Sequence, residues 1–250
     1  MQGILGRMKE ITDLNDLTAA MTQATQQFKQ KSIWWRGEAR VNEKLLPKLY
    51  RPEHSKHVET NLCSNFILRA KTLYPECPGW GERDAWLFLM QHYGLATRLL
   101  DWTESALIAT FFTVIEHSDE TGVLWALSPY SFNKNQIDLP LILGPHSEWV
   151  RNILAPAFSQ DAKSSDLILA INAQHFDVRM MMQQSAFTIH GTKNPLNDLP
   201  DSEKFLTQFR IPAKAKASLK STFQMLGVTK SYLFPDLEHL AKDLMSGERF

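Results

Sequence analysis

The stretch Gln91-His92-Tyr93-Gly94-Leu95-Ala96-Thr97-Arg98-Leu99-Leu100-Asp101-Trp102-Thr103 places a dense set of polar and aromatic side chains directly before the most apolar segment of the chain. That segment, residues 106–115, is apolar nearly all round, which predicts a helix buried in the core, capped by Asp101 or Thr103 and running to about His117. Polar side chains set against a core helix must bond one another or face a ligand, because burying them unsatisfied is costly. The stretch is therefore the first candidate for a binding site.

Two interpretations of this stretch stay open. In the structural one, Asp101 caps the helix, Arg98 pairs with Asp101, and His92 and Trp102 are packed and satisfied. In the functional one, the same side chains line a ligand site.

Two further runs carry candidate site residues. Ile33, Trp34 and Trp35 predict a short strand that stops at Arg36-Gly37, where the glycine permits a close approach. A planar guanidinium beside aromatic faces suits a phosphate or a nucleotide ring, whereas the alternative is internal pairing of Arg36 with Glu38 or Asp101. The second run places Gln183 and Gln184 before the strand-like segment 186–189. A glutamine at a strand edge can hydrogen-bond an amide or a ribose hydroxyl of a ligand, and the alternative is an ordinary surface residue.

The rest of the chain alternates irregularly between helical and strand patterns. The spacing of apolar residues predicts helices at about 13–30, 54–74, 82–93, 213–226 and 236–245, and strands at 122–127, 167–171, 186–189 and 209–211. This order lacks the steady alternation of a doubly wound sheet. At 250 residues the pattern predicts one α+β domain, residues 31–250, with an irregular small sheet at its core and flanking helices, preceded by a helical flank over residues 1–30.

The formal net charge of zero comes from cancellation between segments. The chain has 27 basic and 27 acidic side chains, which argues against a protein that coats nucleic acid by bulk charge. Residues 29–56 carry eight basic and three acidic residues, residues 72–122 carry two basic and eight acidic ones, and residues 204–230 carry six basic residues and no acidic one. We expect the oppositely charged segments to meet at the candidate site, with Arg98 a better anion ligand than any lysine of the basic runs. The lysines of 204–230 either point outward from a helix or contact an acidic target.

Several kinds of site are disfavoured. The chain has no phosphate-binding glycine loop, no dinucleotide-binding glycine motif, no nucleophile elbow and no His-Glu-x-x-His motif. His54 and His57 stand three apart without a matching carboxylate or thiol pair, so no metal is expected. The two cysteines, Cys63 and Cys77, favour a reducing cytoplasm, and no apolar stretch is long enough for a membrane span.

Taken together, these runs resemble the FRG domain family. The resemblance is carried by Trp35-Arg36-Gly37, the run 46–51, the whole of 91–103, Phe111-Phe112, Arg179 with Gln183 and Phe187-Thr188, and the tail 233–237, over about residues 30–242. The chain departs from the family pattern in having a tryptophan for the first phenylalanine, Ala96 for a usual proline and Ser185 for a usual glycine.

The resemblance implies a bacterial or phage-encoded effector acting as a toxin or in antiviral defence. The order of signals is similar to that of the ADP-ribosyltransferase fold, which implies NAD as cofactor and transfer of ADP-ribose to a protein or nucleic-acid target, with a neutralising partner protein as a further partner. The residues are then assigned as follows: Arg36 and Arg98 hold the pyrophosphate, Gly37 lets the backbone approach, His92, Tyr93, Thr97 and Trp102 frame the cofactor, and Glu38, Asp101 or Gln183 stabilises the oxocarbenium-like centre.

One feature leaves a second function open. Transferases of that fold generally carry a glutamate on the late strand, whereas this chain has Gln183-Gln184 there. The alternative is a non-catalytic module that binds a nucleotide, a nucleic acid or a phage protein through the same cleft.

Overall fold

The computed structural model describes residues 10–41, 44–172 and 177–246. Six strands form one antiparallel sheet in the order β4-β5-β2-β1-β3-β6. The strands are β1 (Trp34–Glu38), β2 (Leu99–Thr103), β3 (Gly122–Leu127), β4 (Ile168–Ile171), β5 (Ser185–His190) and β6 (Leu206–Ile211). The prediction of an α+β protein is confirmed.

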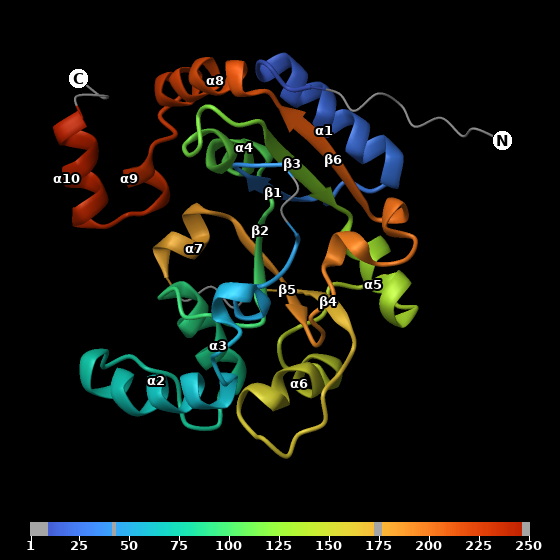
Figure 1. Ribbon diagram of the computed structural model, residues 1–250, viewed down its shortest axis with the longest axis vertical. Helices are drawn as coiled ribbons and strands as arrows, with labels where there is room; N and C mark the ends of the chain where they lie inside the picture. The colour runs from blue at the N-terminus through green and yellow to red at the C-terminus, as the bar shows by residue number, and fades with distance from the viewer. Residues whose placement is uncertain (1–9, 42–43, 173–176, 247–250) are drawn as a thin grey trace.

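Ten α-helices are found in the described residues, and Figure 1 shows them distributed around the sheet. They are α1 (Leu14–Phe28), α2 (Glu59–Leu73), α3 (Arg83–His92), α4 (Ala106–Val114), α5 (Pro129–Ile137), α6 (Glu148–Leu154), α7 (Val178–Met182), α8 (Ala213–Met225), α9 (Lys230–Leu233) and α10 (Leu237–Ser246). Short 3₁₀ turns lie at Lys48–Tyr50, Pro52–His54, Ala155–Ala157, Leu196–Asp198 and Ser202–Lys204.

The first helix belongs to the same core as the sheet. Asp13 caps α1 by accepting a hydrogen bond from the backbone N–H of Asp16. The buried side chains of α1, among them Leu17 and Phe28, pack with α4, α8 and the strands β1, β3 and β6. These helices cover the upper part of the sheet in Figure 1. A second cluster around Trp34, Trp102 and Phe132 fills the opposite side.

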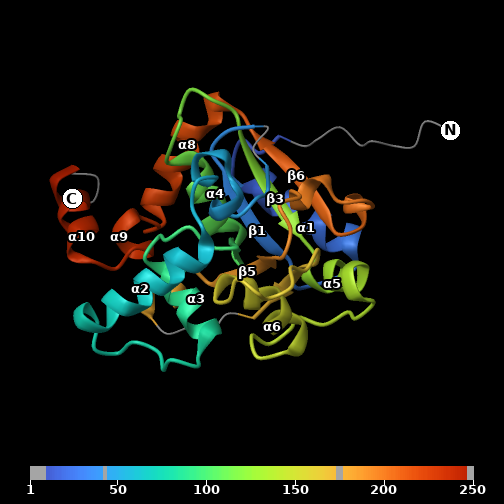
Figure 2. The same cartoon turned by 60° about the horizontal axis from the view of Figure 1, so that its bottom comes forward.

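Helices α2, α3 and α6 cover the other end of the sheet. Side chains of α3 and α6 pack on β4 and β5, and α2 packs in turn on α3. Figure 2, with the lower end turned forward, shows these three helices together. The sheet is thus enclosed by two helical layers at its two ends, and strands β1 and β2 meet between them.

Three features differ from the sequence-based elements. Asp101 and Thr103 lie in strand β2, and the buried helix α4 is capped by Ser105, whose hydroxyl accepts from the backbone N–H of Ile108. Strand β1 does not stop at Arg36-Gly37 but continues to Glu38. Asp101 is extended because it pairs with Phe187 of β5, a contact that the local sequence does not encode.

Candidate functional site

The two central strands of the sheet part after a single residue pair. In the described residues β1 pairs with β2 only at Trp35 and Thr103, whereas β1 forms five pairs with β3 and β2 forms five with β5. A cavity of about 580 Å³ opens beside the parted segments, lined by residues 35–40 of β1 and the following loop and by residues 99–103 of β2. This volume lies in the range of small-molecule and cofactor sites.

Arg36 is fixed on one wall of the cavity. Its Nε donates to Oε1 of Glu38 at 2.6 Å, and its Nη1 donates to the backbone carbonyl of Asp101 at 2.7 Å. Alternation along the strand places the side chains of Arg36 and Glu38 on the same face. The internal pairing considered for Arg36 is therefore present, and both paired side chains line the cavity.

The close approach at Gly37 is made by helix α4. A Cβ atom at this position would lie 2.0 Å from the backbone oxygen of Ala109 and 2.3 Å from Oγ1 of Thr113. Gly37 thus allows α4 to press against β1, and this contact rather than a ligand accounts for the glycine. The packing holds α4 behind the cavity, to which Ala109 also contributes.

Asp101 presents an exposed carboxylate to the cavity. Its Oδ2 accepts a hydrogen bond from Nε2 of Gln91 at 2.8 Å, while its backbone oxygen accepts from Arg36. Asp101 and Arg98 do not pair, because the two side chains bond different partners. Its negative charge also acts on a second cation at the cavity, Arg179.

Arg179 and Gln183 form the opposite wall, from α7 and the residue that follows it. The guanidinium of Arg179 lies 4.4 Å from the ring centre of Phe234, and its Nη1 donates to the backbone oxygen of His92. Burial lowers the pKa of Arg179, an effect that Asp101 opposes. Gln183 donates through Nε2 to the backbone oxygen of Leu233 at 2.9 Å. The C-terminal segment therefore completes this wall.

Arg98 and Thr97 lie away from the cavity. The guanidinium of Arg98, with 5% of its side chain exposed, makes a two-point ion pair with Glu59 of α2 and donates to the backbone oxygen of Ile153. The side chain of Thr97 bonds Gln91. The structure does not bring Arg98 together with Arg36. We expected Arg98 to be a better anion ligand at the site than any lysine, but Lys48 lines the cavity and Arg98 does not.

The three aromatic candidates are divided between different places. His92 pairs through Nδ1 with Asp177 at 2.8 Å, and burial lowers its pKa against the opposing effect of that carboxylate. Tyr93 is 58% exposed and lies over a groove between α2 and α3. Trp102 does line the cavity, and its Nε1 donates to Oγ1 of Thr188 at 3.1 Å. Of the proposed framing residues, the structure therefore places only Trp102 at the cavity.

The residues from 31 to 122 match the family model of the FRG domain. The chain contains an FRG domain. The match includes Trp35-Arg36-Gly37 and the whole of 91–103, and it ends at Gly122, the first residue of β3, so residues 123–242 of the expected resemblance lie outside it. No curated protein and no solved structure matches the chain.

The FRG domain supplies one wall of the cavity and the rest of the chain supplies the other. Three cations that the sequence did not predict as site residues, Arg40, Lys48 and Arg51, lie in the matched region and line the cavity, whereas Arg179 lies outside the matched region. The basic excess of residues 29–56 was the signal that could have identified the first three. The expectation that oppositely charged segments meet here is confirmed, because Arg36 and Asp101 come from the two segments.

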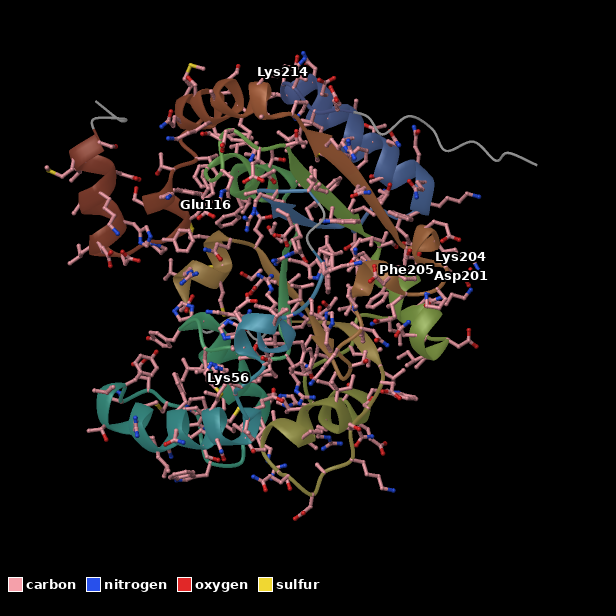
Figure 3. All side chains as sticks on the ribbon, viewed as in Figure 1. Lys56, Glu116, Asp201, Lys204, Phe205 and Lys214 are labelled. Carbon is pink, nitrogen blue, oxygen red and sulfur yellow. The ribbon has the colours of Figure 1, made fainter. Side chains whose placement is uncertain are left out.

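The later basic segment contains one buried lysine. Nζ of Lys216 donates to the backbone oxygens of Ala39, Glu116 and His117 at 2.7, 3.1 and 2.8 Å. The expectation that all lysines of 204–230 point outward is wrong for Lys216, because its ammonium satisfies three carbonyls at the cavity edge. Figure 3 marks Glu116 in the interior of the view and Lys214 of α8 at the periphery.

Three other properties follow from the described residues. No three His, Cys, Asp or Glu side chains among them gather as a metal-ion site would require. In the same residues, no helix combines the length and the apolar character needed to cross a membrane. Both Cys63 and Cys77 are free thiols.

Proposed function

We propose that this FRG-domain protein binds NAD in the cavity between β1 and β2 and transfers ADP-ribose from it to a protein or nucleic-acid target. The observation that carries the proposal is the cavity itself, where the parting of two paired strands leaves a nucleotide-sized space with arginines and a carboxylate on its walls. The cavity walls offer five cations, Arg36, Arg40, Lys48, Arg51 and Arg179, and four carboxylates, Glu38, Glu53, Asp101 and Glu116.

The pyrophosphate is assigned to Arg36 and Arg179. Arginine recognises phosphate oxygens through a rigid planar fork, and a fork held in place by its own contacts loses less entropy on binding. Arg36 is held by Glu38 and the Asp101 carbonyl, and Arg179 by the ring of Phe234. Arg179 thus takes the role that the sequence assigned to Arg98, because Arg98 is bound to Glu59.

Asp101 is the carboxylate assigned to the transfer step. As the bond between ribose C1′ and the nicotinamide nitrogen breaks, the electron pair leaves with nicotinamide and positive charge develops at C1′, which a nearby carboxylate stabilises. A nucleophilic oxygen or nitrogen of the target then bonds to C1′ and loses its proton to solvent. Glu38 is less suited because Arg36 binds it and it is 7% exposed, whereas the Asp101 side chain is exposed. Gln183 is assigned to orient the bound NAD through its side-chain amide.

The test uses purified protein, NAD and a cell extract that supplies targets. Mass spectrometry should detect released nicotinamide and ADP-ribose adducts with the native chain. Asp101→Asn should abolish both products while NAD binding, measured by calorimetry, changes little. The matched control is Asp201→Asn. Asp201 lies on the surface beside Lys204 (Figure 3) and does not line the cavity, and asparagine tolerates its left-handed backbone. No turnover by folded protein across several target classes would exclude the transfer.

A non-catalytic nucleotide-binding module is the second candidate, favoured by one observation. Strand β5 carries no glutamate, and Gln183, which lies between α7 and β5, donates through Nε2 to the Leu233 carbonyl. This candidate predicts that Arg36→Ala abolishes binding of the nucleotide while neither the native chain nor any variant releases nicotinamide.

The effector role is proposed from the FRG domain. If the protein is a toxin or an antiviral defence component, expression of the native chain should slow growth or limit phage, and Asp101→Asn should remove that effect at equal protein level. Equal effects of the native chain and the variant would separate the effector role from the proposed chemistry. A neutralising protein would be found as a suppressor of the growth defect.

A further inference from the structure

Helix α10 is amphipathic, and it turns its polar side toward the protein. The ring of His239 stacks on Phe234 with 4.8 Å between ring centres, and Oδ2 of Asp243 accepts a hydrogen bond from the backbone N–H of Ser231 at 2.8 Å. The apolar residues follow helical spacing on the opposite side, and none of the helix is buried. These exposed residues are Leu237 (83%), Leu240 (42%), Leu244 (51%) and Met245 (87%).

A groove on the α2–α3 layer has the matching character. It has a volume of about 780 Å³ and runs along one side of α2, lined by mostly apolar residues that include Val58, Phe66, Leu73 and Tyr93. Val58, Leu73 and Tyr93 are more than half exposed, at 52, 83 and 58%. A contiguous exposed apolar surface with a polar rim marks an interaction site.

The two surfaces are complementary in charge. Lys56, His57 and Arg69 line the groove, and no carboxylate is among the described residues that line it. The segment 236–246 carries three carboxylates against one lysine, Lys242, a formal charge of −2. Asp236 and Asp243 bond His239 and Ser231 of their own chain, and Glu238, beside Lys242, is the carboxylate most exposed to solvent, at 73%. An acidic amphipathic helix is the occupant that such a groove favours.

The positions of the helix and the groove fit a reciprocal arrangement. Helices α10 and α2 lie on the same side of the molecule in both Figure 1 and Figure 2, one above the other in Figure 1. A two-fold axis on that side would bring α10 of each copy opposite α2 of the other. A ten-residue helix is only about 15 Å long and about 10 Å wide, so one contact is small. Two equal contacts double that area, because each copy contributes both a helix and a groove to the interface, and a standard interface buries roughly 800 Å² per partner.

We propose that the protein forms a two-fold homodimer in which the apolar side of α10 of each copy occupies the α2–α3 groove of the other. The proposal does not depend on the transfer reaction. It has a consequence for the cavity, because α10 stacks on Phe234, a cavity-wall residue, so that each copy would hold the C-terminal wall of its partner in place.

Sedimentation equilibrium of the native chain and three variants tests this dimer. The native chain should have twice the monomer mass of 28.7 kDa. The helix variant Leu240→Asp/Leu244→Asp and the groove variant Val58→Asp/Leu73→Asp should each raise the dimer dissociation constant by about 30-fold or more. The matched control is Leu68→Asp, because Leu68 is 66% exposed on α2 and does not line the groove. Circular dichroism confirms that the variants fold.

A mixture of the two variants identifies the pairing. Each variant alone has both contacts broken, whereas a heterodimer regains one intact contact between a native α10 and a native groove. The mixture should therefore dimerise more tightly than either variant alone. A monomeric native chain, a groove variant that dimerises like the native chain, or a mixture no tighter than its components would overturn the proposal. Selective capture of an acidic amphipathic peptide by a monomeric chain would instead assign the groove to another protein.

Discussion

The ion pair between Arg98 and Glu59 allows the strongest test of which arginines belong to the cavity. The resemblance to the ADP-ribosyltransferase fold implies that Arg98 holds the pyrophosphate, whereas the structure buries it against α2 with Nε of Arg98 2.9 Å from Oε1 of Glu59. Only 5% of the Arg98 side chain and 11% of the Glu59 side chain are exposed. Burial works against the charged form of Arg98, but its bonds to Glu59 prevail and raise its pKa. The pair therefore joins α2 to the start of β2.

Removing one partner leaves the other charge buried without compensation. Arg98→Met and Glu59→Leu should each lower the free energy of unfolding by about 3–5 kcal/mol, the cost of breaking a buried ion pair on one side. For a chain of this size that corresponds to a fall in melting temperature of about 6–20 °C. The double variant should lose much less than the sum, because no unpaired charge remains.

Urea denaturation of the native chain, both single variants and the double variant measures this coupling. Glu148→Gln serves as the control, since Glu148 is exposed on α6 and should change stability by less than about 0.5 kcal/mol. NAD affinity is measured on the same proteins below their unfolding range. Arg98→Met should bind NAD like the native chain.

One combination of results would refute the reasoning. If Arg98→Met were as stable as the native chain but bound NAD at least tenfold more weakly, Arg98 would belong to the ligand site, as the sequence suggested. Additive losses in the double variant would likewise show that the two side chains are not coupled.

Three further predictions follow from buried groups. Burial lowers the pKa of His190 to about 3, so the folded state stays neutral while the unfolded state takes up a proton below about pH 6.5. Stability should fall by up to about 1.4 kcal/mol per pH unit as the pH drops from about 6 toward 3, and His190→Leu should flatten this slope in urea titrations at several pH values. Gly37→Ala should lower the free energy of unfolding by about 3 kcal/mol, because the added methyl group clashes with the Ala109 carbonyl. An unchanged melting temperature would contradict this packing of α4 on β1. Lys216→Met should lower the free energy of unfolding by about 3 kcal/mol, because three buried carbonyls lose their donor. Calorimetry of the control Lys214→Met, on the exposed side of the same helix, should detect a change below about 0.5 kcal/mol.

Local patterns were sufficient where an element depends on its own residues. The cap at Asp13 and the apolar spacing gave α1, and Gly227, with a φ of 78°, follows the end of α8 as expected. The sequence pattern predicted no helix at α5 or α6. Ser128 and Ser147 cap these helices, so a local signal for each was present.

Long-range pairing decided what local patterns could not. Strand β2 contains Asp101 and Thr103, which by type also suit a helix N-cap. The segment is extended because β5, more than eighty residues later in the chain, pairs with it. The sequence pattern predicts Lys216 to be a surface lysine on a helix. Only the fold brings three carbonyls, distant in sequence, to its ammonium.

By itself the sequence determined the α+β class and the FRG domain, and it singled out Arg36, Asp101 and Gln183, which line the cavity. These rest on residue type and short-range order, which the chain carries locally. Which arginine faces the cavity was decided only by tertiary structure. The partner of Arg98, Glu59, lies 39 residues away on helix α2. The parting of β1 from β2, which creates the space, is a relation between strands about sixty residues apart.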